Sequence, residues 1–352
     1  MELYRLVVPA LAALEISPVA LQLRGAAPLA ARYHPDLNPD QPALIGPIES
    51  LEQCRALCTR LNQVYPEEHV VTALERVGQP GTTTTAMPLQ EIAEWAPLHR
   101  ASLLYIPSLP CAGAVETFQN TVAHLRAPDG CPWDREQTHR SLRQGFQEEA
   151  YEVLDALDRG DLGALQEELG DVLLHVLLQA QIAAENGEFR LSDVVCHVNH
   201  KIVYRHPHVF GGLEVGGVAE VLVNWEELKQ QEKEQRLEAP SPLDGIPQAM
   251  PALARAQSIQ RHVDRTAVST EKVARLSVQA KADLERLAMA PEPTEAGLVL
   301  GQLLFALADL ARALGIDAEG ALREANTRFE KRFRETERGG QRTEASAPHP
   351  GV

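Results

Sequence analysis

Four carboxylates in the middle of the chain repeat a spacing of three residues. Glu149 and Glu152 form one pair, and Glu168 and Asp171 form a second. Residues three apart lie on one face of an α-helix. The connection near Gly160 is short, so the two helices are expected to be antiparallel neighbours. The sequence therefore predicts that four carboxylates converge at one helix–helix seam.

Such a cluster repels itself unless a cation neutralises it, because burying an uncompensated carboxylate costs several kcal/mol. An all-oxygen site suits Mg²⁺ or Mn²⁺ better than zinc, which prefers nitrogen and sulfur ligands. The alternative is a solvated acidic face, the ordinary meaning of a single Glu-Glu-x-x-Glu motif. The second acidic pair is flanked by Leu169 and Val172, which places it near the core and favours a metal site.

A metal held by carboxylates points to phosphate chemistry, and phosphates need further cations. Lys201 and Arg205 lie four residues apart and are predicted to bind phosphate, although alone they would indicate a solvated basic face. His206 and His208 are expected to cap helix carbonyls or to pack. Trp133 could stack on a nucleobase or be a core tryptophan, and the two alternatives are equally supported.

The elements that must position these side chains are helices. From Gly113 onward, apolar residues recur at helical spacing. We expect four helices, at about 115–125, 136–157, 162–185 after an N-cap at Asp161, and 192–205. Four helices with short loops predict a bundle over 113–212. Residues 1–110 instead alternate short apolar runs with proline-rich turns, which is typical of an α/β domain.

The rest of the chain is predicted to be mainly helical. Residues 213–252 contain a charged helix at 225–238 and a proline-rich linker, 253–337 form a second helical region, and 338–352 are polar and expected to be disordered. Leu169-Gly170-Asp171 is similar to Leu300-Gly301-Gln302, so the bundle is predicted to be duplicated.

The composition and charge of the chain exclude several classes of function. The 352 residues are 44% apolar and carry a formal charge of −16, which opposes binding to nucleic-acid polymers and anionic membranes. The five cysteines are odd in number and lack a Cys-x-x-Cys pair, so Cys54 and Cys58 are interpreted as buried thiols. With no membrane-length apolar run and no signal peptide pattern, we expect a cytoplasmic protein.

Several motifs within 113–212 together resemble the MazG-type nucleotide pyrophosphohydrolases. They are Cys131-Pro132-Trp133-Asp134, Gln137-Thr138-His139, Glu148-Glu149-x-x-Glu152, Glu168-Leu169-Gly170-Asp171, and the run from Lys201 to Gly211. The resemblance implies that Glu149, Glu152, Glu168 and Asp171 bind Mg²⁺ and that Lys201 and Arg205 meet the triphosphate. It also implies release of a nucleoside monophosphate and pyrophosphate, a role in nucleotide-pool house-cleaning, and a homodimer or higher homo-oligomer.

Two other segments resemble known domains. Residues 253–337 are similar to the second domain of two-domain MazG proteins, but Ala282, Val299 and Gln302 stand at three of the four ligand places, with Glu285 at the fourth. We therefore expect a degenerate second copy without activity. Residues 1–110 resemble the C-terminal half of a tetrapyrrole methylase domain without its glycine-rich opening, and are expected to be a structural remnant.

The expected reaction is attack of water on the α-phosphorus, with Glu148 or a ligand such as Glu149 as the base. Two other function classes stay open. A catalytically decayed nucleotide-binding or assembly module would bind without turnover. A di-iron oxidoreductase would need Glu-x-x-His pairs, whereas acidic residues stand three positions after Glu149, Glu152 and Glu168.

Overall fold

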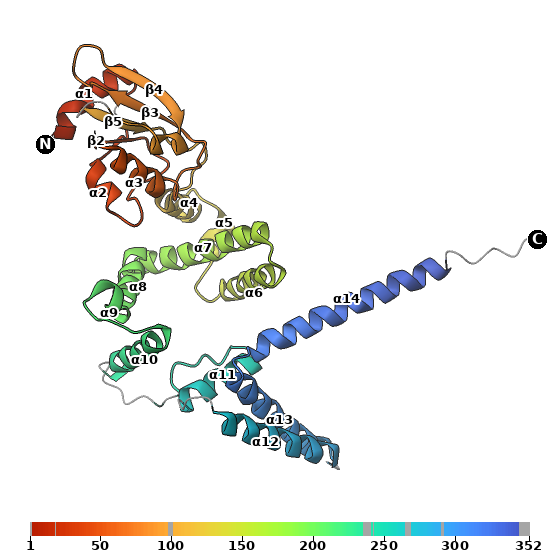
Figure 1. The fold of residues 1–352 in the computed structure, drawn as a ribbon. Coiled ribbons are helices and arrows are strands. Elements are labelled where there is room, and N and C mark those ends of the chain that lie inside the picture. Colours follow the sequence, from red (N-terminus) through yellow and green to blue (C-terminus); the bar gives the residue numbers. More distant parts are fainter. Residues whose placement is uncertain are drawn as a thin grey trace, which may run out of the picture. The chain divides into compact units, whose positions relative to one another are not determined.

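The structure is a computed structural model that describes residues 2–17, 19–97, 101–234, 241, 243–264, 269–289 and 292–344 (Figure 1). Its internal contacts divide it into two compact units. The first comprises Met1–Leu157 with Asp161–Val194, and the second comprises Asp158–Gly160 with Val195–Val352. Each unit is described by itself, and the domain boundaries expected from the sequence stay predictions.

The first unit begins with a small α/β part, as expected. Its elements are α1 (Glu2–Leu14), β1 (Gln22–Arg24), α2 (Ala26–Ala30), β2 (Ala43–Ile48), α3 (Leu51–Leu61), β3 (Val70–Glu75), β4 (Thr83–Pro88), η1 (Leu89–Ala93) and β5 (Ser102–Ile106). The strands form one mixed sheet in the order β1-β2-β5-β3-β4, in which β1 and β2 are parallel and the other pairs are antiparallel.

Alternating side chains of the central strands enter a core on each face of this sheet. Ile45 and Ile48 of β2 pack with Leu57 and Leu61 of α3 on one face. Leu44 packs with Leu74, Leu103 and Ala10 of α1 on the other face. The thiols of Cys54 and Cys58 are buried, as predicted.

Helices make up the remainder of the first unit: α4 (Val115–Arg126), α5 (Pro132–Glu136), α6 (Arg143–Arg159) and α7 (Leu162–Glu185). The predicted N-cap of α7 is confirmed, because the Asp161 carboxylate accepts hydrogen bonds from the backbone N–H groups of Gly163 and Ala164, both at 3.1 Å. Val122, Leu177 and Ile182 are buried in a core shared by α4 and α7.

The second predicted helix begins later than the sequence indicated. We expected it to start near residue 136, whereas α6 starts at Arg143. In between, the Ser141 hydroxyl accepts from the N–H of Thr138 at 2.9 Å, and the Thr138 hydroxyl accepts from the N–H of Ser141 at 3.1 Å. Such side-chain bonds to the backbone compete with helical hydrogen bonds, so this stretch forms a turn.

The fourth predicted helix, α8 (Leu191–Arg205), is followed by α9 (Pro207–Phe210) and α10 (Val218–Glu234). α8 starts at Leu191 because the Asp193 carboxylate accepts from the N–H of Arg190 at 2.8 Å. α10 begins earlier than the charged helix expected at 225–238, and residues 235–240 lie outside the described residues.

The second unit also contains α11 (Ala252–Val263), α12 (Thr270–Met289), α13 (Pro293–Ala313) and α14 (Ala318–Glu344). Two buried glutamines of α11 join these helices. The Gln257 amide donates to the carbonyls of Ala308 and Ile316, and its oxygen accepts from the N–H of Ala318. The Gln260 amide donates to the carbonyl of Phe305 at 2.7 Å.

Two observations in this unit differ from the expectations. The helix α14 continues to Glu344, into the tail expected to be disordered from 338 (Figure 1); the first proline of this stretch is Pro348, so no backbone N–H is missing before it. Within the described part of the chain, α13 is long and apolar enough to span a membrane by composition. Only 22% of its most apolar window is buried, including Val299 and Leu303, and a single helix of this kind is weak evidence for a membrane span.

Candidate functional site

The structure brings three of the predicted carboxylates together at the seam between α6 and α7. One ligand oxygen from each of Glu149, Glu152 and Glu168 lies within 4.8 Å of the others. Glu149 and Glu152 are one turn apart on α6, and Glu168 lies on α7. The fourth predicted carboxylate, Asp171, follows one turn after Glu168 and is close enough to act on Glu149 electrostatically.

Mutual repulsion perturbs this cluster in the absence of a cation. The pKa of Glu149 is raised by desolvation and by the charges of Asp171, Glu152 and Glu148. The pKa of Glu168 is also raised, by desolvation and by Glu152, Glu167 and Glu149. Both shifts have the sign that neighbouring negative charges produce. A divalent cation with oxygen ligands would remove this repulsion, so the donor set fits Mg²⁺ or Mn²⁺.

Glu148, the other candidate base, is exposed beside the cluster and accepts a hydrogen bond from the Gln144 amide at 2.9 Å. Gln144 lies one turn earlier on α6, so this bond holds one Glu148 oxygen along its own helix. The other oxygen remains a possible proton acceptor.

His175 is a neighbour that the sequence reasoning missed. It lies one turn after Asp171 on α7, and its ring packs edge-on against Phe146 of α6, with ring centroids 5.9 Å apart. A Cβ at Gly145 would lie 3.0 Å from this ring, so the small residue lets α6 approach α7. Desolvation lowers the pKa of His175, although the charge of Asp171 opposes the shift. His175 could have been found from the sequence, because it follows Asp171 by four residues and residues at that spacing share a helix face.

The two predicted phosphate-binding cations belong to the second unit. Lys201 and Arg205 are one turn apart on α8. The Arg205 guanidinium is only 14% exposed; its Nε donates to Glu232 at 3.1 Å, and its Cζ lies 5.5 Å from the centroid of the Trp225 ring. The imidazole of His206 hydrogen-bonds the carbonyl of Ile202 at 2.7 Å, as expected for a residue at a helix end.

Trp133 is 65% exposed on the short helix α5. The alternative of a core tryptophan is therefore wrong, and the ring is available for stacking. The α5 segment is held by Arg126, the last residue of α4, which the sequence reasoning did not single out. A basic residue in the last helical turn, just before a Pro-Asp-Gly turn, was the available signal.

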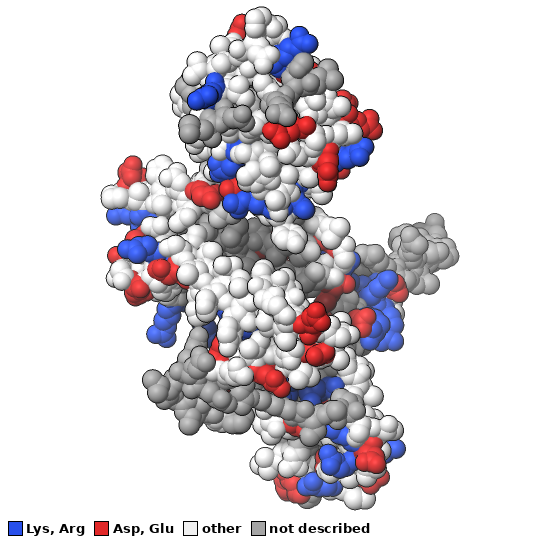
Figure 2. Space-filling model, turned by 60° about the vertical axis from the view of Figure 1, so that its left-hand side comes forward, with Lys and Arg blue, Asp and Glu red and all other residues white. Residues whose placement is uncertain are grey.

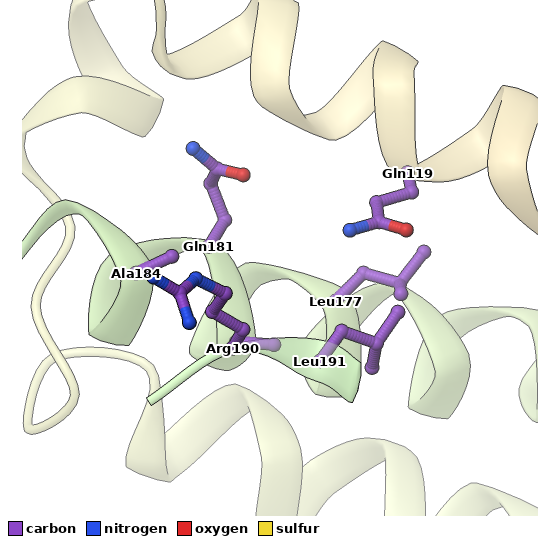
Figure 3. Close-up of a pocket in the computed structure, with 7 residues that line it drawn as sticks. Gln119, Leu177, Gln181, Ala184, Arg190 and Leu191 are labelled. Atoms are coloured by element: carbon purple, nitrogen blue, oxygen red, sulfur yellow. The ribbon is translucent and has the colours of Figure 1, made fainter. Parts of the chain in front are cut away.

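A pocket lies on another side of α7. Gln119 of α4 faces Leu177 across it, and Gln181, Arg190 and Leu191 complete its lining with Ala180 and Ala184 (Figure 3). Nine residues separate Glu168 from Leu177, which at about 100° per residue puts them on opposite faces of the helix. The pocket is therefore separate from the carboxylate cluster.

The charged surface does not concentrate cations on the face seen in Figure 2. Among its coloured residues, Lys and Arg side chains are interspersed with Asp and Glu. On this face, an anionic ligand would consequently depend on individual side chains or on a bound cation rather than on a broad basic surface.

The seam between α12 and α13 has different chemistry from the first one. Asp283 is 2% exposed, and its carboxylate is 3.3 Å from the Arg286 guanidinium and accepts from the Gln279 amide at 3.0 Å. Gln302, at a predicted ligand place, is 3.5 Å from Arg286, and Val299 is buried. A guanidinium of the chain itself thus neutralises this seam.

Comparison with known proteins gives consistent matches. The family model described as "MazG nucleotide pyrophosphohydrolase domain" matches residues 137–210, which include the carboxylate pairs and Lys201 and Arg205. The chain is 39% identical over 239 residues to a nucleoside triphosphate pyrophosphohydrolase of Escherichia coli, covering 64% of this chain and 87% of that protein. It is 38% identical over 222 residues to the nucleoside triphosphate pyrophosphohydrolase/pyrophosphatase MazG of Thermotoga maritima, covering 63% and 85%.

A longer relative is the uncharacterized protein YabN of Bacillus subtilis, 36% identical over 281 residues. That alignment covers 78% of this chain but only 57% of YabN, so the chain spans a little over half of that protein. The alignment with the E. coli protein extends well beyond the stretch matched by the family model. This chain therefore belongs to the MazG nucleotide pyrophosphohydrolase family.

Proposed function

We propose that this protein hydrolyses nucleoside triphosphates to a nucleoside monophosphate and pyrophosphate, with Mg²⁺ as its cofactor. The observation that carries the proposal is the convergence of Glu149, Glu152 and Glu168 within 4.8 Å at one helix seam. Family membership and the names of the E. coli and T. maritima relatives support the same reaction. Cleansing of the nucleotide pool in the cytoplasm is the corresponding cellular role.

Glu149, Glu152, Glu168 and Asp171 would hold the cation. When bound, it supplies neutralising charge to the triphosphate and acidifies water at the site. Glu148 or Glu149 accepts a proton from the attacking water, whose oxygen bonds to the α-phosphorus. The bond from that phosphorus to the oxygen that bridges to the β-phosphorus breaks, and pyrophosphate leaves with the bridging oxygen.

Lys201 and Arg205 are proposed to stabilise the negative charge of the phosphates. For Arg205 this requires the guanidinium to share or exchange its contact with Glu232. Arginine can bind a carboxylate and a phosphate through different edges of its planar fork. Trp133 is proposed to stack on the nucleobase, a contact that accepts any base.

We further propose that the protein works as a homodimer or a higher homo-oligomer. None of the residues of α8 is buried within the chain. Its exposed apolar residues include Val194, Val195, Val198, Ile202 and Val203. An apolar surface of this kind on a helix that carries site residues is typical of an interface, and a second copy of the chain is its simplest partner.

The direct test incubates the purified chain with Mg²⁺ and a panel of ribo- and deoxyribonucleoside triphosphates, and identifies the products. The proposal expects equal amounts of monophosphate and pyrophosphate, and no turnover after chelation of the metal. Orthophosphate as the product would refute the reaction type. Tight nucleotide binding without turnover would favour the decayed binding module.

A further inference from the structure

The side chain of Arg126 ties three separate segments together at the end of α4. It is 6% exposed, and its Nε and Nη2 donate to both carboxylate oxygens of Glu185, the last residue of α7, at 2.8–3.1 Å. Its Nη1 donates to the backbone carbonyls of Asp134 and of Gln137, the latter at 3.3 Å. One guanidinium therefore anchors the C-terminal half of α5 to α7.

The turn between Arg126 and α5 is folded tightly against the last turn of α4. The N–H of Cys131 donates to the carbonyl of Leu125 at 2.8 Å. A Cβ at Gly130 would lie 2.2 Å from the carbonyl oxygen of His124 and 2.4 Å from that of Leu125. Only glycine permits this approach, so the turn has little freedom to shift against α4.

Trp133 lies between these anchored points. Its own carbonyl accepts a hydrogen bond from the Gln137 amide at 3.0 Å, and the next carbonyl along the chain, that of Asp134, accepts from Arg126. The backbone is thus held around the tryptophan, while its ring is exposed. A rigid backbone under an exposed flat ring lowers the ordering cost of binding a planar ligand.

We propose that Arg126 is a positioning residue that fixes Trp133 for stacking on the nucleobase, and thereby sets the affinity for the nucleoside part of the substrate without contacting the substrate. The proposal rests on the pyrophosphohydrolase function proposed above. The planar fork of arginine is essential, because lysine can pair with Glu185 but cannot reach a carboxylate and two carbonyls at once.

The test compares Arg126→Lys with Glu185→Gln in the full chain. Arg126→Lys should raise KM for nucleoside triphosphates about tenfold with kcat changed less than twofold. It should leave inhibition by inorganic tripolyphosphate, which has no base, unchanged. Glu185→Gln is the matched control: it removes the charge pair but keeps Arg126 and its carbonyl contacts, so KM should stay near the wild-type value. Equal KM changes in the two variants would show a merely structural role and overturn the proposal.

A double-mutant cycle with Trp133→Ala tests whether Arg126 acts through the tryptophan. Trp133→Ala should raise KM as Arg126→Lys does, and the double variant should be no worse than Trp133→Ala alone, because coupled residues are not additive. Additive effects, or an unchanged KM for Trp133→Ala, would overturn the proposal. Should Arg126→Lys fail to fold, Gln137→Ala, which removes a side-chain contact with the Trp133 backbone, takes its place in the cycle.

The dissociation constant of α,β-methylene ATP, measured with Mg²⁺ on the same variants, separates this proposal from the proposed reaction. Positioning by Arg126 predicts about tenfold weaker binding in Arg126→Lys even if the wild-type chain turns over no substrate. Absent turnover with that binding pattern would refute the reaction alone. Normal turnover with equal dissociation constants in wild type and Arg126→Lys would refute the positioning role alone.

Discussion

At the scale of single residues, the site depends on charge rather than on shape. Glu149 on α6 and Glu168 on α7 both have a raised pKa. Desolvation and the charges of Asp171, Glu152 and Glu148 act on Glu149, and the Glu149 charge is one of those that act on Glu168. A folded state that raises a carboxylate pKa gains stability at low pH and loses it as pH rises through the raised pKa. Without metal, the cluster is thus a source of instability at neutral pH, and removal of one charge relieves it.

The first prediction concerns Glu152→Gln and Asp171→Asn. Each replaces a charged oxygen ligand by a neutral group of almost the same size, so turnover should fall at least a hundredfold. In metal-free protein at pH 7, thermal melting should stay equal or rise, because repulsion is reduced. Glu167→Gln on the same helix serves as a control and should keep activity. Near-normal turnover in either test variant would show that the metal does not bind at the substituted residue.

The second prediction concerns the phosphate contacts. Lys201→Ala should weaken triphosphate binding by about 1.5–3 kcal/mol, the usual contribution of a hydrogen bond to a charged group. Metal uptake, measured by Mn²⁺ titration, should not change. Lys281→Ala, at an exposed position on α12, is the control for loss of one positive charge. Identical kinetics for wild type and Lys201→Ala would assign that side chain to a solvated face.

At the scale of elements, α4 connects the α/β part to the helices of the first unit. Its own N-cap residue, Ala114, offers no side-chain acceptor. Asp40 supplies one from the α/β part, accepting from the N–H groups of Gly113 at 2.7 Å and Ala114 at 3.2 Å. The pKa of Asp40 is lowered, chiefly by a hydrogen bond with the Thr117 side chain. The two backbone bonds also lower this pKa, whereas burial raises it. The α/β part thus supplies the hydrogen-bond acceptor at the N-terminal end of α4.

The third prediction follows from this contact. Asp40→Asn should destabilise the protein by about 1 kcal/mol at pH 7, the usual cost of a weakened helix cap. Because the folded state lowers the Asp40 pKa, the contribution of this carboxylate to stability is present above the ordinary aspartate pKa and is lost as pH falls through the lowered folded pKa. Urea unfolding of both proteins across pH 3–7 should show the difference shrinking below about pH 4. A difference that grows at low pH would contradict the cap.

The fourth prediction concerns the turn between α4 and α5. Gly130→Ala should destabilise the protein by about 1–3 kcal/mol, because the new methyl group would overlap two backbone carbonyls. Gly212→Ala is the control, since a Cβ there meets no heavy atom within 4 Å. Thermal melting compares the two. If Gly130→Ala melts as the wild type does, the turn can move and the platform under Trp133 is not rigid.

At the scale of the whole molecule, two acidic helix seams differ in how they are neutralised. The α6–α7 seam brings Glu149, Glu152 and Glu168 within 4.8 Å of one another, whereas Asp283 in the α12–α13 seam is paired with Arg286. The Arg286 guanidinium supplies the positive charge that a divalent ion would otherwise supply, and it does so without the free-energy cost of dehydrating that ion. We therefore expect the second seam to bind no metal and all chemistry to take place in 113–212.

The fifth prediction tests this division. In the full chain, the double variant Glu152→Gln/Glu168→Gln should lose all Mn²⁺ binding detectable by calorimetry, while Arg286→Gln should keep the wild-type stoichiometry. Mn²⁺ that remains bound to the double variant at more than a weak, nonspecific level would place a further metal site outside the α6–α7 seam.

Local patterns in the sequence were sufficient for much of the fold. Helical periodicity predicted α4, α7 and α8, and the residue type of Asp161 predicted the N-cap of α7. These features depend on residues within one or two turns of each other. The three-residue spacing of the carboxylates likewise predicted their faces, because that spacing is a property of the helix itself.

Other features required the tertiary structure, because they arise between residues far apart in the chain. Whether Trp133 is buried depends on what packs over α5, and periodicity does not report packing partners. The engagement of Arg205 by Glu232 and Trp225, and the bond of Asp40 to α4, join segments that no local pattern relates. The sequence by itself determined which residues can carry the chemistry, and the fold decided which partners each side chain meets.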